Sequence, residues 1–194
     1  MSYKSEIQNK NIAWFLPRPK PDRYKGGMPL HCEKWLLELA GDLLGRRDFR
    51  LLNLFCGMNT EGFRVDIKPE VNPDLVADAH NFVNLLPDRF SEFDVILADP
   101  PYSNKESEEL YGTSPLRYKD WTNECDKVLS PNGILIVYHK QVMPNPNPEK
   151  YYVEKRVFVG NRVYHVPRIA IYFRKKELGY NSVNKKNLIY TQPI

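Results

Sequence analysis

The segment FDVILADPPY, residues 93–102, constrains the fold of this chain more than any other part of it. Its first six residues form a mostly apolar run of strand length, and two prolines follow directly after Asp99. Such a run is typical of a strand buried on both faces, as in a parallel sheet with helices on both sides. Ligands of open α/β sheets bind where the strands end. We therefore expect an α/β protein with a ligand site at Asp99.

Other runs of strand length support the same fold class. They lie at residues 49–55, 63–67, 75–77 and 134–139. The alternating segments 151–159 and 162–174, on either side of Gly160-Asn161, predict a terminal β-hairpin. The sheet is therefore expected to be mostly parallel and to end in an antiparallel hairpin.

Two segments predict helices. The first begins at Pro29, repeats leucines on one face and ends at Gly45, where a C-terminal cap is expected. The second opens at Ser114 and Pro115 and ends before the turn-like sequence Ser130-Pro131-Asn132-Gly133. We expect three regions: a basic N-terminal arm at 1–28, one folded domain at 29–174 and a basic C-terminal tail at 175–194.

With its motif in place, the chain resembles the class I S-adenosylmethionine-dependent methyltransferases of the amino (DPPY-motif) type, in particular the DNA N6-adenine enzymes. In that family the fourth strand ends in Asp/Asn/Ser-Pro-Pro-Tyr/Phe, and the resemblance covers roughly residues 29–174. It implies a Rossmann-like sandwich and S-adenosyl-L-methionine as cofactor. It also implies that the catalytic set is Asp99, Pro100, Pro101 and Tyr102.

The resemblance further implies a set of cofactor-binding residues. The sequence LLNLFCG, residues 51–57, matches the first strand and the cofactor loop of the family. Asp66 matches the acid that accepts hydrogen bonds from the ribose hydroxyls, and Ile67 would lie against the adenine. Asp78 and Ala79 match the segment at the adenine amino edge. The implied cofactor-binding residues are Asn53, Phe55, Cys56, Gly57, Asp66, Ile67, Asp78 and Ala79.

Two features depart from the family pattern. The family usually has an acidic residue where Asn53 stands, and an amide cannot pair ionically with the cofactor ammonium. Only residues 56–62 separate the first two strands of the folded domain, so their crossover is expected to be an extended loop instead of a helix. Helices are thus expected to be reduced after the first strands.

The resemblance implies methyl transfer to the exocyclic amine of a nucleobase. Asp99 and the Pro100 carbonyl would accept the amine hydrogens while Tyr102 stacks on the base. We expect adenine N6 in DNA, and a base in a duplex would have to be flipped out. One alternative is an RNA adenine-N6 or guanine-N2 methyltransferase acting on rRNA or tRNA. Another is a non-catalytic nucleic-acid or partner-binding module, which the Asn53 and short-loop departures favour.

Charge is mild overall but concentrated at the two ends. The net charge is +4, with a sequence pI near 8.8, which permits a polyanionic partner. We expect DNA as the partner, with RNA as the alternative. The predicted phosphate contacts are Arg18, Lys20, Arg23, Lys25 and Lys105, and further basic residues of the C-terminal end are Arg174, Lys175, Lys176, Lys185 and Lys186. The chain leaves little room for a target-reading domain, so a specificity subunit or a homodimer is a possible source of specificity.

Several classes are not expected. No apolar stretch approaches the roughly 18–20 residues that a membrane span needs, and the first ten residues resemble no secretory signal. Three cysteines without a CxxC pair fit reduced thiols in the cytoplasm. The four histidines show no ligand spacing, so we expect no metal and interpret them as packing or surface residues.

Overall fold

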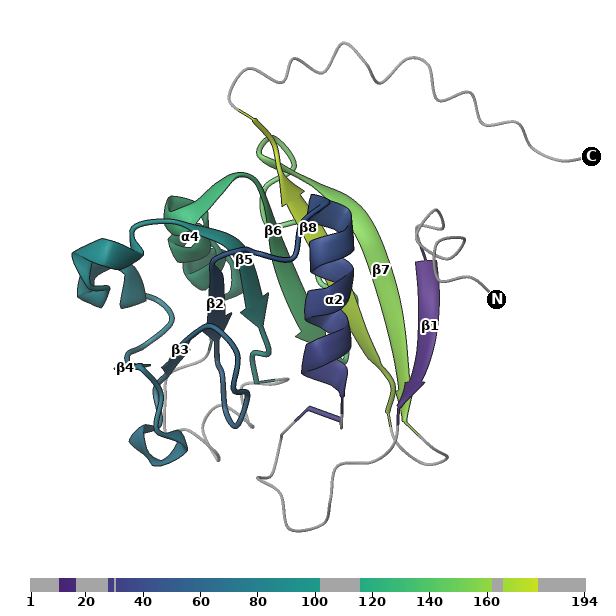
Figure 1. Ribbon diagram of the computed structural model, residues 1–194, viewed down its shortest axis with the longest axis horizontal. Coiled ribbons are helices and arrows are strands. Elements are labelled where there is room, and N and C mark those ends of the chain that lie inside the picture. The colour runs from purple at the N-terminus through teal and green to yellow at the C-terminus, as the bar shows by residue number, and fades with distance from the viewer. Residues whose placement is uncertain (1–10, 17–27, 30, 102–115, 162–165, 178–194) are drawn as a thin grey trace, which may run out of the picture.

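The computed structural model describes residues 11–16, 28–29, 31–101, 116–161 and 166–177, and its centre is an eight-stranded sheet (Figure 1). The strand order is β1-β7-β8-β6-β5-β2-β3-β4. The strands are β1 (Asn11–Leu16), β2 (Leu51–Leu54), β3 (Phe63–Asp66), β4 (Leu75–Val76), β5 (Phe93–Ala98), β6 (Leu129–His139), β7 (Tyr151–Asn161) and β8 (Arg168–Lys175). Only β8 runs antiparallel to its neighbours, β6 and β7. This arrangement confirms the predicted α/β sandwich with a terminal hairpin.

One α-helix packs on each face of the sheet in the described part of the chain. The helix α2 (Cys32–Leu44) lies on one face and α4 (Tyr118–Val128) on the other, as Figure 1 shows. At the end of α2, Gly45 has a left-handed φ of 72°, and its N–H donates to the Asp42 carbonyl. The predicted C-terminal cap is therefore confirmed. The predicted start of the second helix, at Ser114 and Pro115, lies outside the described residues.

The connections from β2 to β5, residues 55–92, contain no α-helix, as expected. β2 and β3 pair in parallel through a loop, residues 55–62, with Leu52 opposite Phe63. Between β3 and β5 the helical segments are short 3-10 turns: η1 (Pro69–Val71), η2 (Phe82–Leu85) and η3 (Asp88–Phe90). The sheet therefore keeps its topology with fewer covering helices on this side.

The segment predicted as a basic arm contains the edge strand β1. Its six residues pair in parallel with β7, Asn11 opposite Arg156 and Leu16 opposite Asn161. Trp14 and Leu16 are buried on the α2 face, and the Trp14 ring meets the Trp35 ring edge-on at 5.5 Å. Burial of alternate apolar side chains thus draws part of the arm into the sheet.

The terminal hairpin forms, but the prediction that its turn lies at Gly160-Asn161 is wrong. Val159 already pairs with Arg168, and β7 continues through Asn161 to complete its pairing with β1. Gly160 lies opposite Phe15 within the sheet. A glycine is required here because the Phe15 ring lies where a Cβ would stand, not because the chain turns.

The strand β6 begins earlier than predicted, at Leu129 instead of Ile134. Residues 130–133 follow α4 without a separate loop, and the pairing with β5 shifts register between Phe93 and Val95. Asn132 takes a left-handed φ of 60° at this irregularity. The turn-forming sequence is therefore accommodated as an irregular start of the strand.

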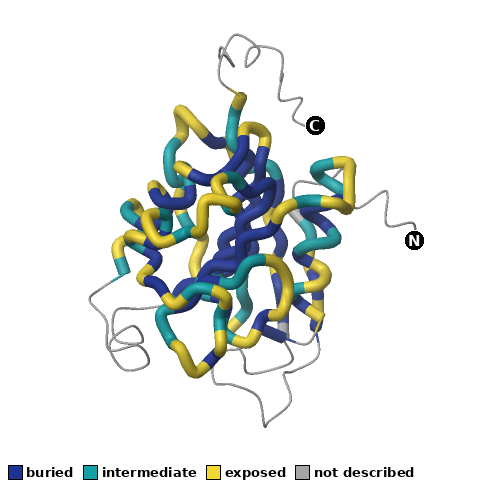
Figure 2. Tube along the Cα trace, turned by 60° about the vertical axis from the view of Figure 1, so that its left-hand side comes forward, coloured by how far each residue is buried: buried dark blue, intermediate teal, exposed yellow. Residues whose placement is uncertain are grey.

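The core consists of two clusters, one on each face of the sheet. Figure 2 shows the buried strands at the centre of the molecule, and all six positions of β5 are buried. Trp121, Phe82 and Phe173 belong to the cluster on the α4 face, whereas Leu36 and Tyr172 belong to the cluster on the α2 face. Within the described ranges, no helix combines the length and the apolar character that crossing a bilayer requires.

Candidate functional site at the carboxyl ends of the strands

Four predicted polar residues lie along one edge of the sheet. Asn53 is in β2, Asp66 ends β3, Asp78 follows β4 and Asp99 follows β5, and these four strands are parallel neighbours. The carboxyl ends of parallel neighbours meet at the same edge, which is where open α/β sheets bind ligands. The topology thus gathers residues that lie far apart in the sequence.

Asp66 fixes the loop that follows β2. Its side chain is 5% exposed, and its two oxygens accept the backbone N–H groups of Gly57 and Lys68, each at 2.9 Å. The Gly57 bond connects β3 to the loop, while the Lys68 bond holds the chain that leaves β3. A carboxylate has about four acceptor positions, so each oxygen can accept a further hydrogen bond.

The loop bends sharply where it leaves β2. Phe55 and Gly57 have φ values of 56° and 49°, and Phe55 is one of few non-glycine residues in this left-handed region. Its ring meets Trp121 of α4 edge-on at 5.5 Å. Cys56 is buried, and burial raises the pKa of its thiol to about 12, so the thiol stays protonated at neutral pH. Phe55 and Cys56 therefore serve as packing residues that shape the loop.

Asn53 is fully buried and its side chain is held by three polar partners. Its Nδ2 donates to Glu33 Oε1 at 2.8 Å and to the Glu61 carbonyl at 3.4 Å. Its Oδ1 accepts from Asn59 Nδ2 at 3.2 Å. The amide thus joins β2 to α2 and to the second half of the loop, and its side chain is not open to a ligand.

Glu33 of α2 is a site residue that sequence reasoning missed. Besides Asn53, its carboxylate accepts the backbone N–H groups of Thr60 at 3.3 Å and Glu61 at 3.2 Å. Burial raises the pKa of Glu33, and these hydrogen bonds oppose the rise. An acid is therefore present beside Asn53, but it comes from another element. The one signal in the sequence was the absence of an acid at position 53. The apolar spacing of the helix gave no reason to assign Glu33 to the site.

The segment after β4 is connected to the start of α4 through His80. Asp78 Oδ1 accepts the His80 backbone N–H at 2.8 Å and lies 2.7 Å from the ring nitrogen Nδ1. The Arg117 N–H donates to His80 Nε2 at 3.1 Å, which requires an unprotonated Nε2. Instead of a simple packing residue, His80 is thus a bridge between Asp78 and the chain that enters α4.

Asp99 is half-buried at the end of β5. Its N–H donates to the Leu54 carbonyl at 3.4 Å, which ties it to the end of β2. Cys32, at the start of α2, is close enough for the Asp99 charge to affect it: burial raises the pKa of this thiol to about 12, and the Asp99 and Glu33 carboxylates add to the rise.

The remaining predicted residues differ in how far they are described. Pro100 is buried, and Pro101 and Ile67 are half-buried. Ala79 is 5% exposed and packs in the core of the α4 face, so its backbone is the part available to a ligand. The others lie outside the described residues: Tyr102, Lys105, Arg18, Lys20, Arg23 and Lys25.

Two basic residues near the C-terminal end have structural partners. Arg174 is 7% exposed; its Nε and Nη2 donate to Glu154 at 2.6 and 2.9 Å, and it also binds the Leu43 carbonyl. Lys175 donates to the carbonyls of Asp126 and Leu129. These two cations stabilise the fold. Because their side chains are already bound within the protein, they are not available to contact a polyanion.

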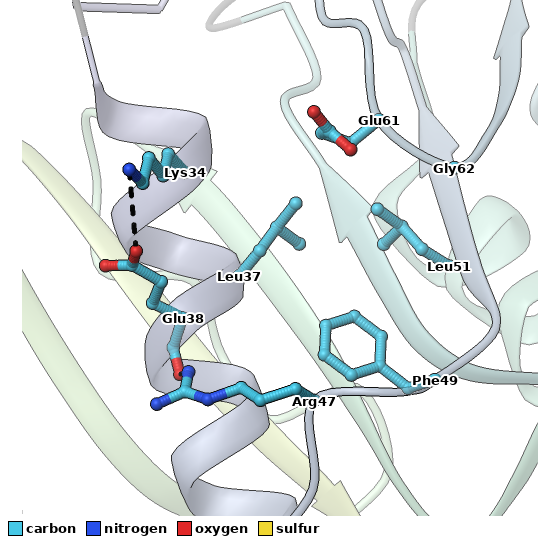
Figure 3. A pocket seen from close by; sticks show the side chains of 8 residues that line it. All are labelled: Lys34, Leu37, Glu38, Arg47, Phe49, Leu51, Glu61 and Gly62. Atoms are coloured by element: carbon cyan, nitrogen blue, oxygen red, sulfur yellow. Dashed lines mark hydrogen bonds and ion pairs between the residues drawn. The ribbon is translucent and has the colours of Figure 1, made fainter.

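A separate pocket lies between α2 and the loop that replaces a crossover helix (Figure 3). It is lined by Lys34, Leu37, Glu38, Arg47, Phe49, Leu51, Glu61 and Gly62. None of the predicted site residues lines it, and it borders the amino ends of β2 and β3. The pocket therefore follows from the short crossover and is distinct from the site at the carboxyl edge.

Comparison with known proteins identifies the fold. No protein-family model matches the chain, and no curated protein matches it. Among solved structures, it is similar to the N-methyltransferase NodS from Bradyrhizobium japonicum in complex with S-adenosyl-L-homocysteine, with a TM-score of 0.53 and 13% identity over 90% of this chain and 96% of that one. It is also similar to TrmN from Thermus thermophilus, with a TM-score of 0.48 and 20% identity over 72% of this chain. The chain spans about half of TrmN, 48% of its length. The fold is thus the Rossmann-like fold of a class I methyltransferase.

Proposed function

We propose that this protein is an S-adenosylmethionine-dependent methyltransferase that acts on the exocyclic amine of a nucleobase, with adenine N6 in DNA as its first candidate substrate. The observation that carries the proposal is the arrangement at the carboxyl edge. There, the buried Asp66 binds the Gly57 N–H of the loop after β2. Asp99-Pro100-Pro101 directly follows β5, the buried strand that pairs with β2.

The residues present fit the cofactor. Asp66 keeps acceptor capacity on both oxygens after binding Gly57 and Lys68, which suits the two ribose hydroxyls. The half-buried Ile67 follows it, and its side chain would contact the adenine ring. Glu33 supplies an acidic group beside Asn53, so the departure at position 53 does not remove negative charge from this end of the site.

When bound, S-adenosylmethionine would supply an electrophilic methyl group on a sulfonium. Asp99 and the Pro100 carbonyl would accept the two hydrogens of the target amine and so direct the nitrogen lone pair. Because Pro101 has no N–H, the turn offers acceptors without a competing donor at that position. The Asp99 carboxylate would stabilise the positive charge that develops on nitrogen. Orientation of this kind can supply roughly 7–11 kcal/mol of the barrier.

Methyl transfer from labelled cofactor to DNA and to RNA, followed by nucleoside analysis, tests the proposal. We expect N6-methyl-2′-deoxyadenosine from the DNA substrate. Product only in RNA, as N6-methyladenine or N2-methylguanine, would establish the RNA alternative. Absence of cofactor binding in calorimetry at high concentration would contradict the enzyme proposal and favour a non-catalytic module.

Asp99→Ala provides the matched test of the catalytic role. We expect at least about a 100-fold loss of transfer, with cofactor binding and melting temperature retained, because Asp99 lies at a strand end outside the core. The control is Asp88→Ala, which removes an exposed carboxylate from η3. Retained activity in Asp99→Ala would refute its role in catalysis.

A further inference from the structure

Two exposed aromatic side chains lie on the sheet face that α4 leaves uncovered. Phe15 of β1 is 79% exposed, and Phe158 of β7 is 42% exposed. β1 and β7 form one end of the sheet, away from β5 and α4 (Figure 1). We call Phe15, Phe158 and the neighbouring Arg156 the aromatic platform. Large exposed apolar side chains that gather on one face mark interaction sites.

The register places the platform residues on the same face. Phe158 lies opposite Ile169, and Ile169 packs against the core cluster of the α4 face. Ala13 lies opposite Phe158 in the next strand, and Phe15 is two residues further on. Because side chains alternate along a strand, Phe15, Phe158 and Ile169 all point to the α4 side of the sheet.

Gly160 lets the Phe15 ring approach the sheet closely. A Cβ atom at Gly160 would lie 2.8 and 2.9 Å from two ring carbons of Phe15, closer than such atoms can come. The ring therefore covers the Gly160 position while its other side is exposed. The Phe15 ring, with one side against Gly160 and the other exposed, is suited to stacking against a flat group.

The platform lies at the same edge of the sheet as Asp99. β1 and β7 run parallel to β5, and their carboxyl ends lie at the same edge. His139 is opposite Ile169, and Val137 is opposite Ala98, so the row containing Phe158 aligns with the residues directly after β5. Three strand spacings separate β7 from β5, roughly 14 Å. About four stacked nucleotides of one strand cover that distance.

The charge around the platform suits a polyanion. The described residues of β1 and β7 that face this side include no acid, and the exposed Arg156 lies two residues before Phe158. The acidic residue of β7, Glu154, instead pairs with Arg174. Aromatic rings combined with an arginine are the features that bind unpaired bases with little sequence preference.

We infer that the aromatic platform stacks with unpaired bases of the nucleic-acid substrate, about four nucleotides along the strand from the target base. The inference rests on the proposed function, because it assigns the strand that enters the Asp99 site. It names single-stranded or locally opened nucleic acid as the substrate form. Stacking of this kind depends little on the sequence, since every base has a π-face whatever its identity.

Binding of a fluorescent single-stranded oligonucleotide, measured by anisotropy, tests this inference. We expect Phe15→Ala/Phe158→Ala to weaken binding by about 10-fold or more. Phe15→Tyr/Phe158→Tyr should retain affinity, whereas Phe15→Leu/Phe158→Leu should lose most of it, because leucine keeps the apolar surface without the ring. Leu85→Ala, at another exposed apolar position, is the control. Cofactor affinity and melting temperature should be unchanged in the double variants.

The outcomes separate this inference from the proposed function. Equal oligonucleotide affinity in wild type and the double alanine variant would overturn the platform, while methyl transfer by both would leave the proposed function intact. Oligonucleotide binding that depends on the platform, without methyl transfer, would support the platform and contradict the proposed function. If the wild type binds no oligonucleotide, the platform is not a nucleic-acid site. The same conclusion follows if the only effect of the double alanine variant is to convert a wild-type dimer to a monomer in sedimentation experiments.

Discussion

Glu33 shows how a contact between distant residues can compensate for a local departure from a motif. The loop after β2 is held from the β3 side by Asp66 and from the α2 side by Glu33. Asn53 lies between them and bonds Glu33 directly. Because Asn53 is fully buried, loss of its acceptor leaves a donor without a partner, at a cost of about 1–3 kcal/mol.

Glu33→Ala should therefore lower cofactor affinity by roughly 10-fold and reduce the free energy of unfolding by about 1–3 kcal/mol. Glu33→Gln should fall between it and wild type, since the amide keeps one acceptor oxygen for Asn53 but presents an NH2 group toward Thr60. Calorimetry with S-adenosylmethionine and urea denaturation measure the two effects. Glu38→Ala, five residues further along α2, is the control. Unchanged cofactor affinity in Glu33→Ala would show that the loop keeps its shape without this carboxylate.

At the scale of elements, the β2–β3 crossover depends on a glycine at its end. Gly62 has a φ of 73°, and a Cβ there would lie 2.6 Å from both the Leu51 side chain and the Leu51 carbonyl oxygen. Gly45, at the end of α2, has nearly the same φ of 72° but no atom within 4 Å of the added Cβ. The two glycines thus share the backbone conformation and differ in close approach.

Comparing Gly62→Ala with Gly45→Ala isolates the cost of the tight crossover. Gly45→Ala should cost about 1–2 kcal/mol, the price of a left-handed residue with a side chain. Gly62→Ala should cost about 3 kcal/mol or more, because its Cβ also collides with Leu51. Denaturant midpoints measured at neutral pH provide the comparison. Equal losses would mean that the loop can move away from β2.

The elements that sequence predicted well are those whose signals are local. β5 is a long apolar run stopped by prolines, and the cap of α2 depends on Gly45 alone. The loop crossover followed from chain length. By contrast, β1 has the same length as β5 but sits in a Lys- and Pro-rich segment, and its place in the sheet depends on pairing with β7. Gly160 was misassigned for the same reason, since Phe15 is its neighbour in space alone.

The candidate site divides in the same way. The positions of Asp66, Asp78 and Asp99 follow from strand ends, which the sequence marks with apolar runs. The contributions of Glu33 and His80 depend on how α2 and α4 meet the sheet. Hydrogen bonds between separate elements leave no periodic trace in a sequence, so neither residue could be assigned before the fold was known.

Across the whole molecule, Asp94 joins several elements into one unit. It accepts the Arg50 N–H before β2 at 2.7 Å and pairs with Arg46 after α2 at 2.8 Å. The Ser130 hydroxyl of β6 approaches it at 3.4 Å. Burial acts to raise the pKa of Asp94, but the Arg50 N–H and the Arg46 and Arg50 guanidiniums together hold that pKa below its usual value.

A carboxyl whose pKa is lowered by folding contributes stability above its unfolded pKa and loses that contribution as pH falls through the folded pKa. Asp94→Asn should therefore cost about 1–3 kcal/mol at pH 7, and the difference from wild type should shrink below about pH 4. The free energies of unfolding of wild type and Asp94→Asn, measured at pH 7 and again below about pH 4, provide this comparison. Asp88→Asn is the exposed control. A difference that is independent of pH would show that the Asp94 contribution is not electrostatic.

The pairing of β1 with β7 also sets the order in which the protein assembles during synthesis. Asn11 pairs with Arg156, so the chain must be synthesised beyond β7 before β1 can dock. Until then Trp14 and Leu16 have no sheet to pack against. Since contacts between such distant residues form slowly, docking of β1 is expected to be a late step in folding. Until β7 is made, β1 is an apolar stretch without its pairing strand, which is the kind of segment that chaperones bind.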